Sequence, residues 1–259
     1  MDLGIKGKNA LICASSRGLG KGCAKALATE GVNVWLNGRD EDTLNAAAQE
    51  IRKVAQGDVT AIACDITTED GRNLALSQTP DLDILVNNAG GPPVGDFRQW
   101  GLQDWHSALN NNMLAPIDLF NRVLDGMIER GFGRIVNITS SSVKAPVQNL
   151  DLSNGARSGL TGFFAGASRQ VAPFNVTVNS ILPGRFDTDR LRSSMRPASE
   201  KSGKTIDQML EVGKAQIPSG RYGSSDEFGA LCAFLCSVHA GYITGQNILI
   251  DGGLVALNL

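Results

Sequence analysis

A glycine-rich segment directly after the first apolar run has the residue types and the spacing to bind phosphate. Residues 13–20 read CASSRGLG, and Gly18 and Gly20 lie where a short apolar run passes into a segment of helical period. A strand, a tight glycine turn and a helix N-terminus together direct backbone N–H groups and the positive end of the helix dipole at one spot. The sequence therefore predicts a pyrophosphate site here, although Gly-x-Gly also occurs in ordinary tight turns.

Five segments spread along the chain carry a resemblance to one known family. Residues 13–20 are similar to its Thr-Gly-x-x-x-Gly-x-Gly pattern, with Cys13-Ala14 in place of Thr-Gly, and residues 87–90 match its Asn-Asn-Ala-Gly motif unaltered. From end to end the chain resembles the short-chain dehydrogenase/reductase family, and its closest look is that of a 3-oxoacyl-[acyl-carrier-protein] reductase. The matching segments are 13–20, 65–66, 87–90, 183–188 and 242–253.

The resemblance implies a dinucleotide cofactor, NADP(H), and the residues that hold it. A Cβ at Ala14 should crowd the backbone's approach to the cofactor, which weakens binding rather than abolishing it, because Ala is the smallest replacement for Gly. The implied cofactor-binding residues are Ala14, Ser16, Arg17, Gly18, Leu19, Gly20, Arg39, Asp65, Ile66, Asn88, Ala89, Gly90, Arg157, Pro183, Gly184 and Thr188.

Charge placement after the second predicted strand selects the phosphorylated cofactor. NAD-preferring dinucleotide folds carry an acidic residue there, which binds the ribose hydroxyls. This strand ends Asn37-Gly38-Arg39, so a guanidinium replaces the acid. Its forked donors suit a 2′-phosphate, and Arg17 can approach the same group. The alternative is a surface ion pair between Arg39 and Asp40.

The resemblance also implies a reactive centre of four residues. In the family a Tyr transfers the proton, a Lys lowers the pKa of that Tyr, a Ser orients the carbonyl, and an Asn holds a water that relays protons. Aligned from Trp105, Asn112 falls at the Asn position, and a gapless alignment from Gly133 puts Ser140 at the Ser position. The same alignment puts Ser153 where the Tyr is expected and Arg157 where the Lys is expected.

Ser153 and Arg157 occupy the positions of the Tyr and the Lys, but their side chains differ in acidity and reach. The i, i+4 spacing of Ser153 and Arg157 puts both side chains on one helix face. A Ser hydroxyl is far less acidic than a phenol and reaches less far, and an Arg does not exchange a proton near neutrality. Tyr222 and Tyr242 are the only tyrosines, and both lie in C-terminal segments that we expect to be structural.

Three functions are compatible with this centre. In the first, the protein is an NADP(H)-dependent oxidoreductase acting on a carbonyl or alcohol, including 3-oxoacyl compounds, and the proton comes from a water held by Ser153 and Arg157 or from Lys144. In the second, the protein is an inactive NADP(H)-binding sensor or structural partner. In the third, Arg157 recognises a carboxylate or phosphate on the substrate, and the chemistry needs no phenol. We favour the first because Asn112 and Ser140 remain.

Apolar runs of strand length alternate with segments of helical period along the whole chain. This alternation predicts a single α/β domain over residues 1–259, a Rossmann-type doubly wound parallel sheet with helices on both faces. The expected strands are 9–13, 32–36, 59–64, 84–87, 135–139, 176–181 and 247–250, and the expected helices are 19–30, 41–54, 102–129, 152–172 and 225–237.

One segment, residues 185–219, is polar and has weak periodicity. We expect an irregular insertion above the carboxyl ends of the strands, where it would act as a substrate lid. Its first half is basic, which favours an anionic substrate or a carrier-linked acyl group as partner, with a solvated basic face as the alternative. The basic residues are Arg185, Arg190, Arg192, Arg196, Lys201 and Lys204.

Composition excludes several other classes of function. The net charge of −2 gives no reason to expect nucleic acid or an anionic membrane as a partner. The N-terminus lacks the apolar segment of a signal peptide, so we expect a cytoplasmic protein. Five cysteines without Cys-x-x-Cys spacing favour buried free thiols over disulfides or a metal site. The family resemblance implies a homotetramer.

Overall fold

Seven parallel strands form one sheet in the order β3-β2-β1-β4-β5-β6-β7. The computed structural model describes residues 1–256, apart from the side chains at positions 197, 198, 200 and 201. The chain winds outward from β1 to β3 and then crosses to β4 on the other side of β1, so the carboxyl ends of β1 and β4 flank a topological switch point. The strands are β1 (Asn9–Ile12), β2 (Asn33–Gly38), β3 (Val59–Ala63), β4 (Ile84–Asn87), β5 (Gly133–Ile138), β6 (Val176–Pro183) and β7 (Asn247–Ile250).

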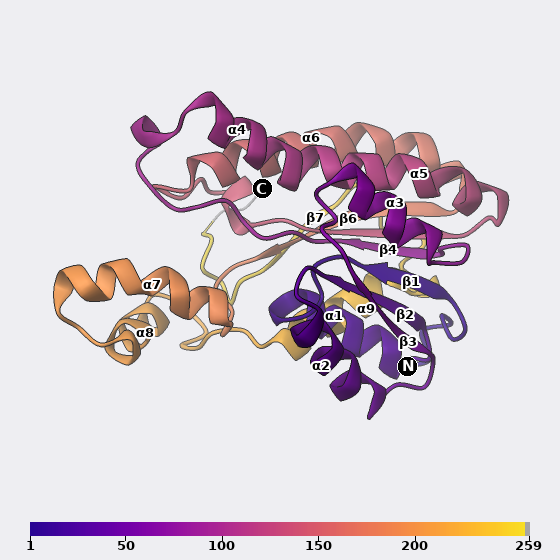
Figure 1. Ribbon diagram of the computed structural model, residues 1–259, viewed down its shortest axis with the longest axis horizontal. Helices are drawn as coiled ribbons and strands as arrows, with labels where there is room; N and C mark the ends of the chain where they lie inside the picture. The colour runs from indigo at the N-terminus through magenta and orange to yellow at the C-terminus, as the bar shows by residue number, and fades with distance from the viewer. Residues whose placement is uncertain (257–259) are drawn as a thin grey trace.

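Helices cover both faces of the sheet, as the sequence predicts for a parallel sheet (Figure 1). One layer holds α1, α2 and α9, and the other holds α3 to α6. The helices are α1 (Gly18–Thr29), α2 (Glu41–Arg52), α3 (Glu69–Ser77), α4 (Leu102–Leu109), α5 (Ala115–Glu129), α6 (Asp151–Val171), α7 (Asp189–Ser202), α8 (Ile206–Ala215) and α9 (Ser225–Cys236). The Rossmann-type fold is therefore confirmed.

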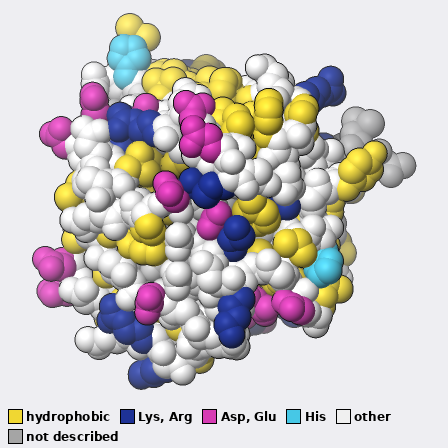
Figure 2. Space-filling view, turned by 90° about the vertical axis from the view of Figure 1, so that its right-hand side faces the viewer, with side chains coloured by type: hydrophobic (Ala, Val, Ile, Leu, Met, Phe, Trp, Pro, Cys, Tyr) yellow, Lys and Arg dark blue, Asp and Glu magenta, His cyan; other side chains and the backbone are white. Residues whose placement is uncertain are grey.

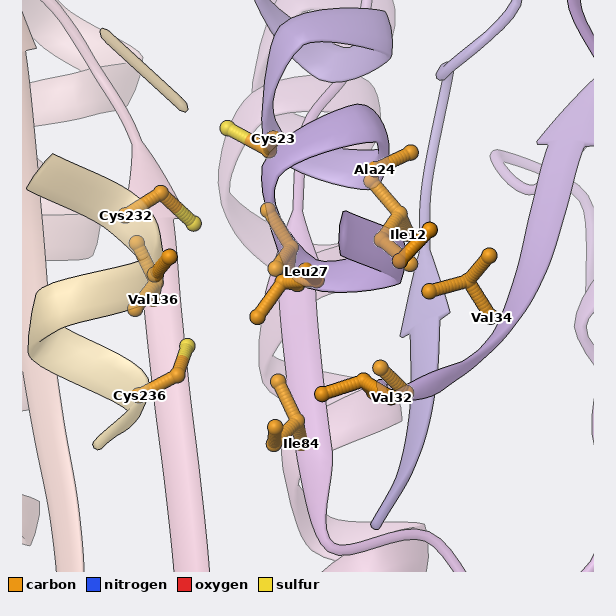
Figure 3. Packing of buried hydrophobic residues seen from close by; sticks show 14 of the residues in the cluster. Ile12, Cys23, Ala24, Leu27, Val32, Val34, Ile84, Val136, Cys232 and Cys236 are labelled. Carbon is orange, nitrogen blue, oxygen red and sulfur yellow. The ribbon is translucent and has the colours of Figure 1, made fainter. Parts of the chain in front are cut away.

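Small side chains let α1 and α9 pack closely over the sheet. Figure 3 shows Cys23 of α1 and Cys232 and Cys236 of α9 among the apolar side chains of the sheet. All five cysteines are free thiols, and burial raises the pKa of Cys13 to about 12. Cys64 is only half-buried, which the sequence did not indicate.

Three expectations about helices are wrong. Helix α3 was not expected, because Leu74 and Leu76 are its only large apolar side chains; its start is set instead by the Thr68 side chain, which accepts a hydrogen bond from Gly71 N. The helix expected over residues 102–129 is broken by a π-helical segment, Asn110–Leu114, between α4 and α5. The segment expected to be irregular, residues 185–219, contains α7 and α8.

Capping explains why helices form in that polar segment. Thr188 caps α7, and Thr205 caps α8 in a capping box with Gln208. The two helices project from the sheet beyond the carboxyl end of β6 (Figure 1). A small cluster separate from the main core joins them to the segment after α8: Leu210, Ile217 and Tyr222 are buried, with Leu191, Met195, Ile206 and Leu254 packed against them.

No helix in residues 1–256 is both long enough and apolar enough to cross a bilayer.

Candidate active site

The glycine-rich turn connects β1 to α1 at the switch point. Gly18 has φ +55°, a left-handed conformation that glycine adopts without steric cost. A Cβ at Gly20 would lie 2.5 Å from Ala14 O and 2.8 Å from Asn88 Nδ2, so this position excludes any side chain. Ala14 also has positive φ, +45°, and it keeps its Cβ in this disfavoured conformation.

Two asparagines hold the turn in place. Asn88 Nδ2 donates to Ala14 O at 3.0 Å, which joins the end of β4 to the turn. Asn37, buried at the end of β2, accepts from Ala14 N at 3.2 Å and donates to Cys64 O at 3.1 Å. From the sequence, Asn88 was predicted to bind the cofactor, and no role was predicted for Asn37. Its position beside the turn depends on the pairing of β1 with β2, which no local motif encodes.

The N-terminus of α1 has no side-chain cap. Arg17 stands at the N-cap position without a side-chain cap, and the first turn of α1 holds no acidic residue. By contrast, side chains cap α2, α3, α7, α8 and α9, and the first turns of α4, α5 and α6, which also lack a side-chain cap, each hold an aspartate. An uncapped helix start at the carboxyl edge of a parallel sheet has the donors and the dipole to bind a phosphate.

The residues expected around an adenosine phosphate gather beside this turn. Arg39 extends into solvent with its side chain 79% exposed, and its Nη1 lies 3.9 Å from Asp65 Oδ2. Arg17 Nη2 donates to Thr43 Oγ1 at 2.9 Å. Asp40 caps α2 by accepting from Thr43 N, rather than pairing with Arg39 as the alternative supposed. Because neither Arg17 nor Arg39 pairs with Asp40, both guanidiniums can turn towards an added phosphate.

The remaining residues of the expected cofactor site lie along the same edge. Thr188 lies beside the turn, since a Cβ at Gly18 would lie 3.6 Å from its methyl group. Gly184 N donates to Ile250 O at 3.0 Å, which fixes the end of β6 against β7. Ser16, Leu19, Asp65, Asn88, Ala89, Pro183 and Gly184 are partly exposed, Ile66 is buried and Gly90 is exposed.

Ser153 and Arg157 lie on one face of α6, as their spacing predicts. Arg157 Nε donates to Ser153 Oγ at 3.2 Å, and Arg157 Nη1 donates to Ile138 O at 2.8 Å. The second bond ties α6 to the end of β5, two residues before Ser140. Both side chains are buried, at 7% exposure for Ser153 and 8% for Arg157. Burial and the nearby charge of Arg190 lower the pKa of Arg157 to about 10.

Asn112 lies within the π-helical segment. Its Nδ2 donates to Ala108 O at 3.3 Å, and its buried Oδ1 has no hydrogen-bond partner among the described residues. The segment packs on α6 because the facing positions are glycines: a Cβ at Gly155 would lie 2.9 Å from the Trp105 ring, and one at Gly159 would lie 2.8 Å from Met113 Sδ. An interrupted helix with an unsatisfied amide at a pocket is typical of a functional site.

Ser140 caps a short 3-10 turn after β5 and accepts a hydrogen bond from Ser142 N at 3.1 Å. The hydroxyl hydrogen of Ser140 is not used by that bond. Lys144 ends the same turn and is partly buried. Neither tyrosine lies in this group: Tyr222 donates to Leu210 O in the cluster of α7 and α8, and Tyr242 is fully exposed.

One contact that the sequence did not predict joins α7 to the loop after β4. Arg190 Nη1 donates to Gly91 O at 3.2 Å, and its Nη2 donates to Pro92 O at 3.3 Å. The sequence treated Arg190 as one of several basic residues, because nothing local distinguishes it from Arg192. Among the described residues, no group of three His, Cys, Asp or Glu side chains is arranged to hold a metal ion.

The fold defines a Rossmann-type α/β protein whose glycine-rich turn lies at the carboxyl edge of the sheet, with buried polar side chains after β5 and on α6. A family profile described as enoyl-(acyl carrier protein) reductase matches residues 13–255. The chain is 33% identical to the 3-oxoacyl-[acyl-carrier-protein] reductase of Aquifex aeolicus, over 98% of this chain and 100% of the relative. It is 32% identical to the NADPH-dependent reductase BacG of Bacillus subtilis, over 95% of this chain and 97% of the relative.

A solved structure has a similar overall fold. The L-sorbose reductase of Gluconobacter frateurii, complexed with NADPH and L-sorbose, superposes with a TM-score of 0.93 at 29% identity, covering 99% of this chain and 100% of the other. The chain belongs to the short-chain dehydrogenase/reductase family.

Proposed function

We propose that the protein is an NADP(H)-dependent oxidoreductase that interconverts a carbonyl and an alcohol with an atypical proton donor. The observation that supports it most is the uncapped start of α1 at the switch point, in a chain matched to its family over nearly its whole length. The relatives described as NADPH-dependent, or complexed with NADPH, support the choice of cofactor.

The N-terminus of α1 would hold the cofactor's pyrophosphate, and Arg17 and Arg39 would hold its 2′-phosphate. Asp65 and Ile66 would flank the adenine. Pro183, Gly184 and Thr188 would lie beside the nicotinamide, with Arg157 donating to the adjoining ribose hydroxyls. When bound, NADPH supplies a hydride to the carbonyl carbon, and the carbonyl oxygen takes up a proton to give the alcohol.

The protein's own groups would orient the carbonyl and deliver that proton. Ser153 Oγ accepts from Arg157 Nε, so its hydroxyl hydrogen is free to donate to a water or to the carbonyl oxygen. Ser140 also has a hydroxyl hydrogen available to orient the carbonyl. Asn112 Oδ1, without a protein partner, would hold a water that connects the pocket to solvent. Lys144 is the second candidate proton donor.

A substrate lid and a homotetramer complete the proposal. Helices α7 and α8 would close over the substrate, which is a small carbonyl compound or one linked to an acyl carrier. Figure 2 shows hydrophobic side chains along its top, the side on which α5 and α6 lie in Figure 1. Exposed hydrophobic residues on or next to these two helices are Leu114, Phe163 and Phe174. Such a surface fits an interface between subunits. A cytoplasmic location stays a prediction from the sequence.

The second candidate function is an NADP(H)-binding sensor without hydride transfer. The observation in its favour is that neither tyrosine reaches the reactive pocket, while the cofactor turn is retained.

Calorimetric titration with NADPH and NADH tests the cofactor assignment. We expect NADPH to bind much more tightly, and Arg39→Asp to weaken NADPH by about 1–3 kcal/mol through the loss of a charge-assisted contact. Asp42→Asn, on the exposed first turn of α2, is the matched surface control. Equal affinity for the two cofactors would contradict the assignment. A screen for NADPH oxidation with carbonyl compounds then separates the enzyme from the sensor.

A further inference from the structure

The loop between β3 and α3, residues 64–68, is held by a chain of hydrogen bonds that ends on the π-helical segment. Asp65 Oδ1 accepts from Thr67 N at 3.0 Å and from Thr67 Oγ1 at 2.7 Å, which fixes the Asp65 carboxylate against its own loop. Thr67 O in turn accepts from Asn110 Nδ2 at 2.9 Å. Asn110 is the first residue of the π-helical segment, 43 positions further along the chain. This contact therefore reaches the loop from the layer that holds α4 and α5.

A second side chain joins the same loop to α5. Arg72 Nη1 donates to Ile66 O at 3.3 Å, and Arg72 Nε lies 2.5 Å from Asp118 Oδ2 on α5. Two successive carbonyls of the loop, those of Ile66 and Thr67, thus each accept from a side chain outside it. A loop that is ordered in advance binds a ligand more tightly, because less conformational entropy is lost on binding.

The loop lies at the end of the sheet where the proposed function puts the adenosine half of the cofactor. Ala63, the last residue of β3, pairs with Gly38 at the end of β2. Asp65 Oδ2, the carboxylate oxygen that Thr67 does not use, is 3.9 Å from Nη1 of Arg39. Ligands of open α/β sheets bind outside the carboxyl ends of the strands, so the loop borders the expected position of the adenosine.

We propose that Asn110 is a positioning residue for the adenosine half of the cofactor. Its amide holds Thr67 O and so keeps Asp65 and Ile66 in the conformation that binds. This inference rests on the proposed function, since it assigns a residue to the same cofactor site. The two asparagines that follow have different contacts: Asn111 Oδ1 accepts from Asn110 Nδ2 at 3.1 Å, and Asn112 Nδ2 donates to Ala108 O.

Two small ligands separate the loop from the glycine-rich turn without any turnover. Adenosine 2′,5′-bisphosphate carries the adenine and the 2′-phosphate, whereas inorganic pyrophosphate fits the start of α1 and has no group for the loop. Calorimetric titration of the full chain with each ligand gives the ratio of the two affinities. A merely structural role of Asn110 would lower both affinities through the folded fraction and would leave that ratio unchanged.

Two aspartate variants, equal in added charge, test the amide. Asn110→Asp keeps the shape of the side chain but is ionised near neutral pH and has no donor for Thr67 O. It should weaken adenosine 2′,5′-bisphosphate about 3–10-fold, the range for one net hydrogen bond, because only the fraction of molecules with the loop in place binds. Pyrophosphate affinity should change by less than about twofold, since one net hydrogen bond is not involved there.

Asn111→Asp is the matched control. It adds the same charge one position away and keeps an acceptor for Asn110 Nδ2, so the ratio of the two affinities should stay as in the unmodified protein. Melting temperatures show that both variants are folded. An unchanged ratio in folded Asn110→Asp would overturn the inference, and so would an equal change in Asn111→Asp.

Hydrogen–deuterium exchange of residues 65–68 without ligand keeps the two proposals distinguishable. Asn110→Asp should speed exchange in this loop about 3–10-fold, and Asn111→Asp should not, because local opening becomes easier where the anchoring bond is lost. If neither NADPH nor adenosine 2′,5′-bisphosphate binds the unmodified protein, the proposed function fails. Faster exchange in Asn110→Asp alone would then still support the anchoring of the loop by Asn110, and unchanged exchange would overturn it.

Discussion

The two edges of the sheet each hold a buried arginine, and the two guanidiniums differ in how many hydrogen bonds they make. At the amino edge, Arg134 is 1% exposed and donates to Ser237 O, Gly133 O, Asn175 O and Asn175 Oδ1, with its guanidinium over the Phe132 ring. At the carboxyl edge, Arg157 has only two hydrogen-bond partners among the described residues, Ser153 Oγ and Ile138 O. Burial lowers the pKa of both side chains.

Backbone conformation differs between the edges in the same sense. At the amino edge, Asn175 has φ +58°, a conformation that Asn tolerates, and its side chain also donates to Gly131 O. At the carboxyl edge, Ala14 has φ +45° with a Cβ and no polar side chain to compensate. The positive φ of Asn175 is thus accompanied by side-chain hydrogen bonds that hold the fold together, while that of Ala14 lies at the turn where the cofactor is expected.

Replacing each arginine by methionine gives the largest difference between the edges. Arg134→Met removes the donor of four hydrogen bonds, to Ser237 O, Gly133 O, Asn175 O and Asn175 Oδ1, and should lower the free energy of unfolding by about 3–5 kcal/mol. Arg157→Met removes an unpaired buried charge and should leave stability unchanged or raise it by about 1–2 kcal/mol. Urea denaturation of both variants measures this. Similar losses at the two positions would show that Arg157 is a structural residue.

Restoring a proton-transferring pair tests whether the carboxyl edge lacks only its chemistry. The double variant Ser153→Tyr plus Arg157→Lys should raise the reduction of generic 3-oxoacyl or diketone substrates by about 10²-fold, the lower end of general acid catalysis. Each single variant should do little, because the Tyr needs the Lys to lower its pKa. Initial rates of NADPH oxidation measure the effect.

Stability and NADPH binding of the double variant must be checked first, because the side chain of Leu150, Leu152 or Phe163 could fill the space that a phenol ring needs. A folded, NADPH-binding double variant without a gain would favour the sensor. If the unmodified protein turns over rapidly and Ser153→Ala keeps that rate, the proton does not come from Ser153. Lys144 is then the next residue to replace.

The smallest expected effect concerns the strained turn. Ala14→Gly relieves a left-handed conformation and should raise the free energy of unfolding by about 0.5–1 kcal/mol, because the relief exceeds the added entropy of glycine in the unfolded chain. NADPH affinity should rise as well. The control, Ala24→Gly in the interior of α1, should lower stability by about 1 kcal/mol. Loss of stability at both positions would mean that Ala14 is unstrained.

Most of the fold could be predicted because strand and helix periods are local. The seven strands appear at the expected places, with ends that differ by a few residues. The failures have physical causes: α3 has few apolar residues, and α7 and α8 form through capping threonines rather than through a strong apolar stripe. The π-helical break at Asn112 depends on contact with α6, so a pattern read along α4 alone predicts a continuous helix.

The sequence predicted which residues of the candidate site share a helix face, but it did not predict the hydrogen bonds that they make. Spacing placed Ser153 and Arg157 on one helix face, but their hydrogen bond and the bond to Ile138 O arise from the way α6 meets β5. Arg190 contacts Gly91 and Pro92, which precede it in the sequence by 99 and 98 positions. Asn37 acts through strand pairing. Each of these is a tertiary contact, and single-sequence patterns carry none of that information.

The separate cluster of α7 and α8 has a consequence for how this protein can evolve. Leu210, Ile217 and Tyr222 pack with one another and not with the main core, so substitutions in α7 and α8 have little effect on the stability of the sheet. Mutations that abolish folding elsewhere are therefore tolerated there. Because Arg190 stands on α7, selection can exchange or reposition a charge next to the pocket in a single step, and new substrate preferences can arise without compensating changes in the rest of the chain.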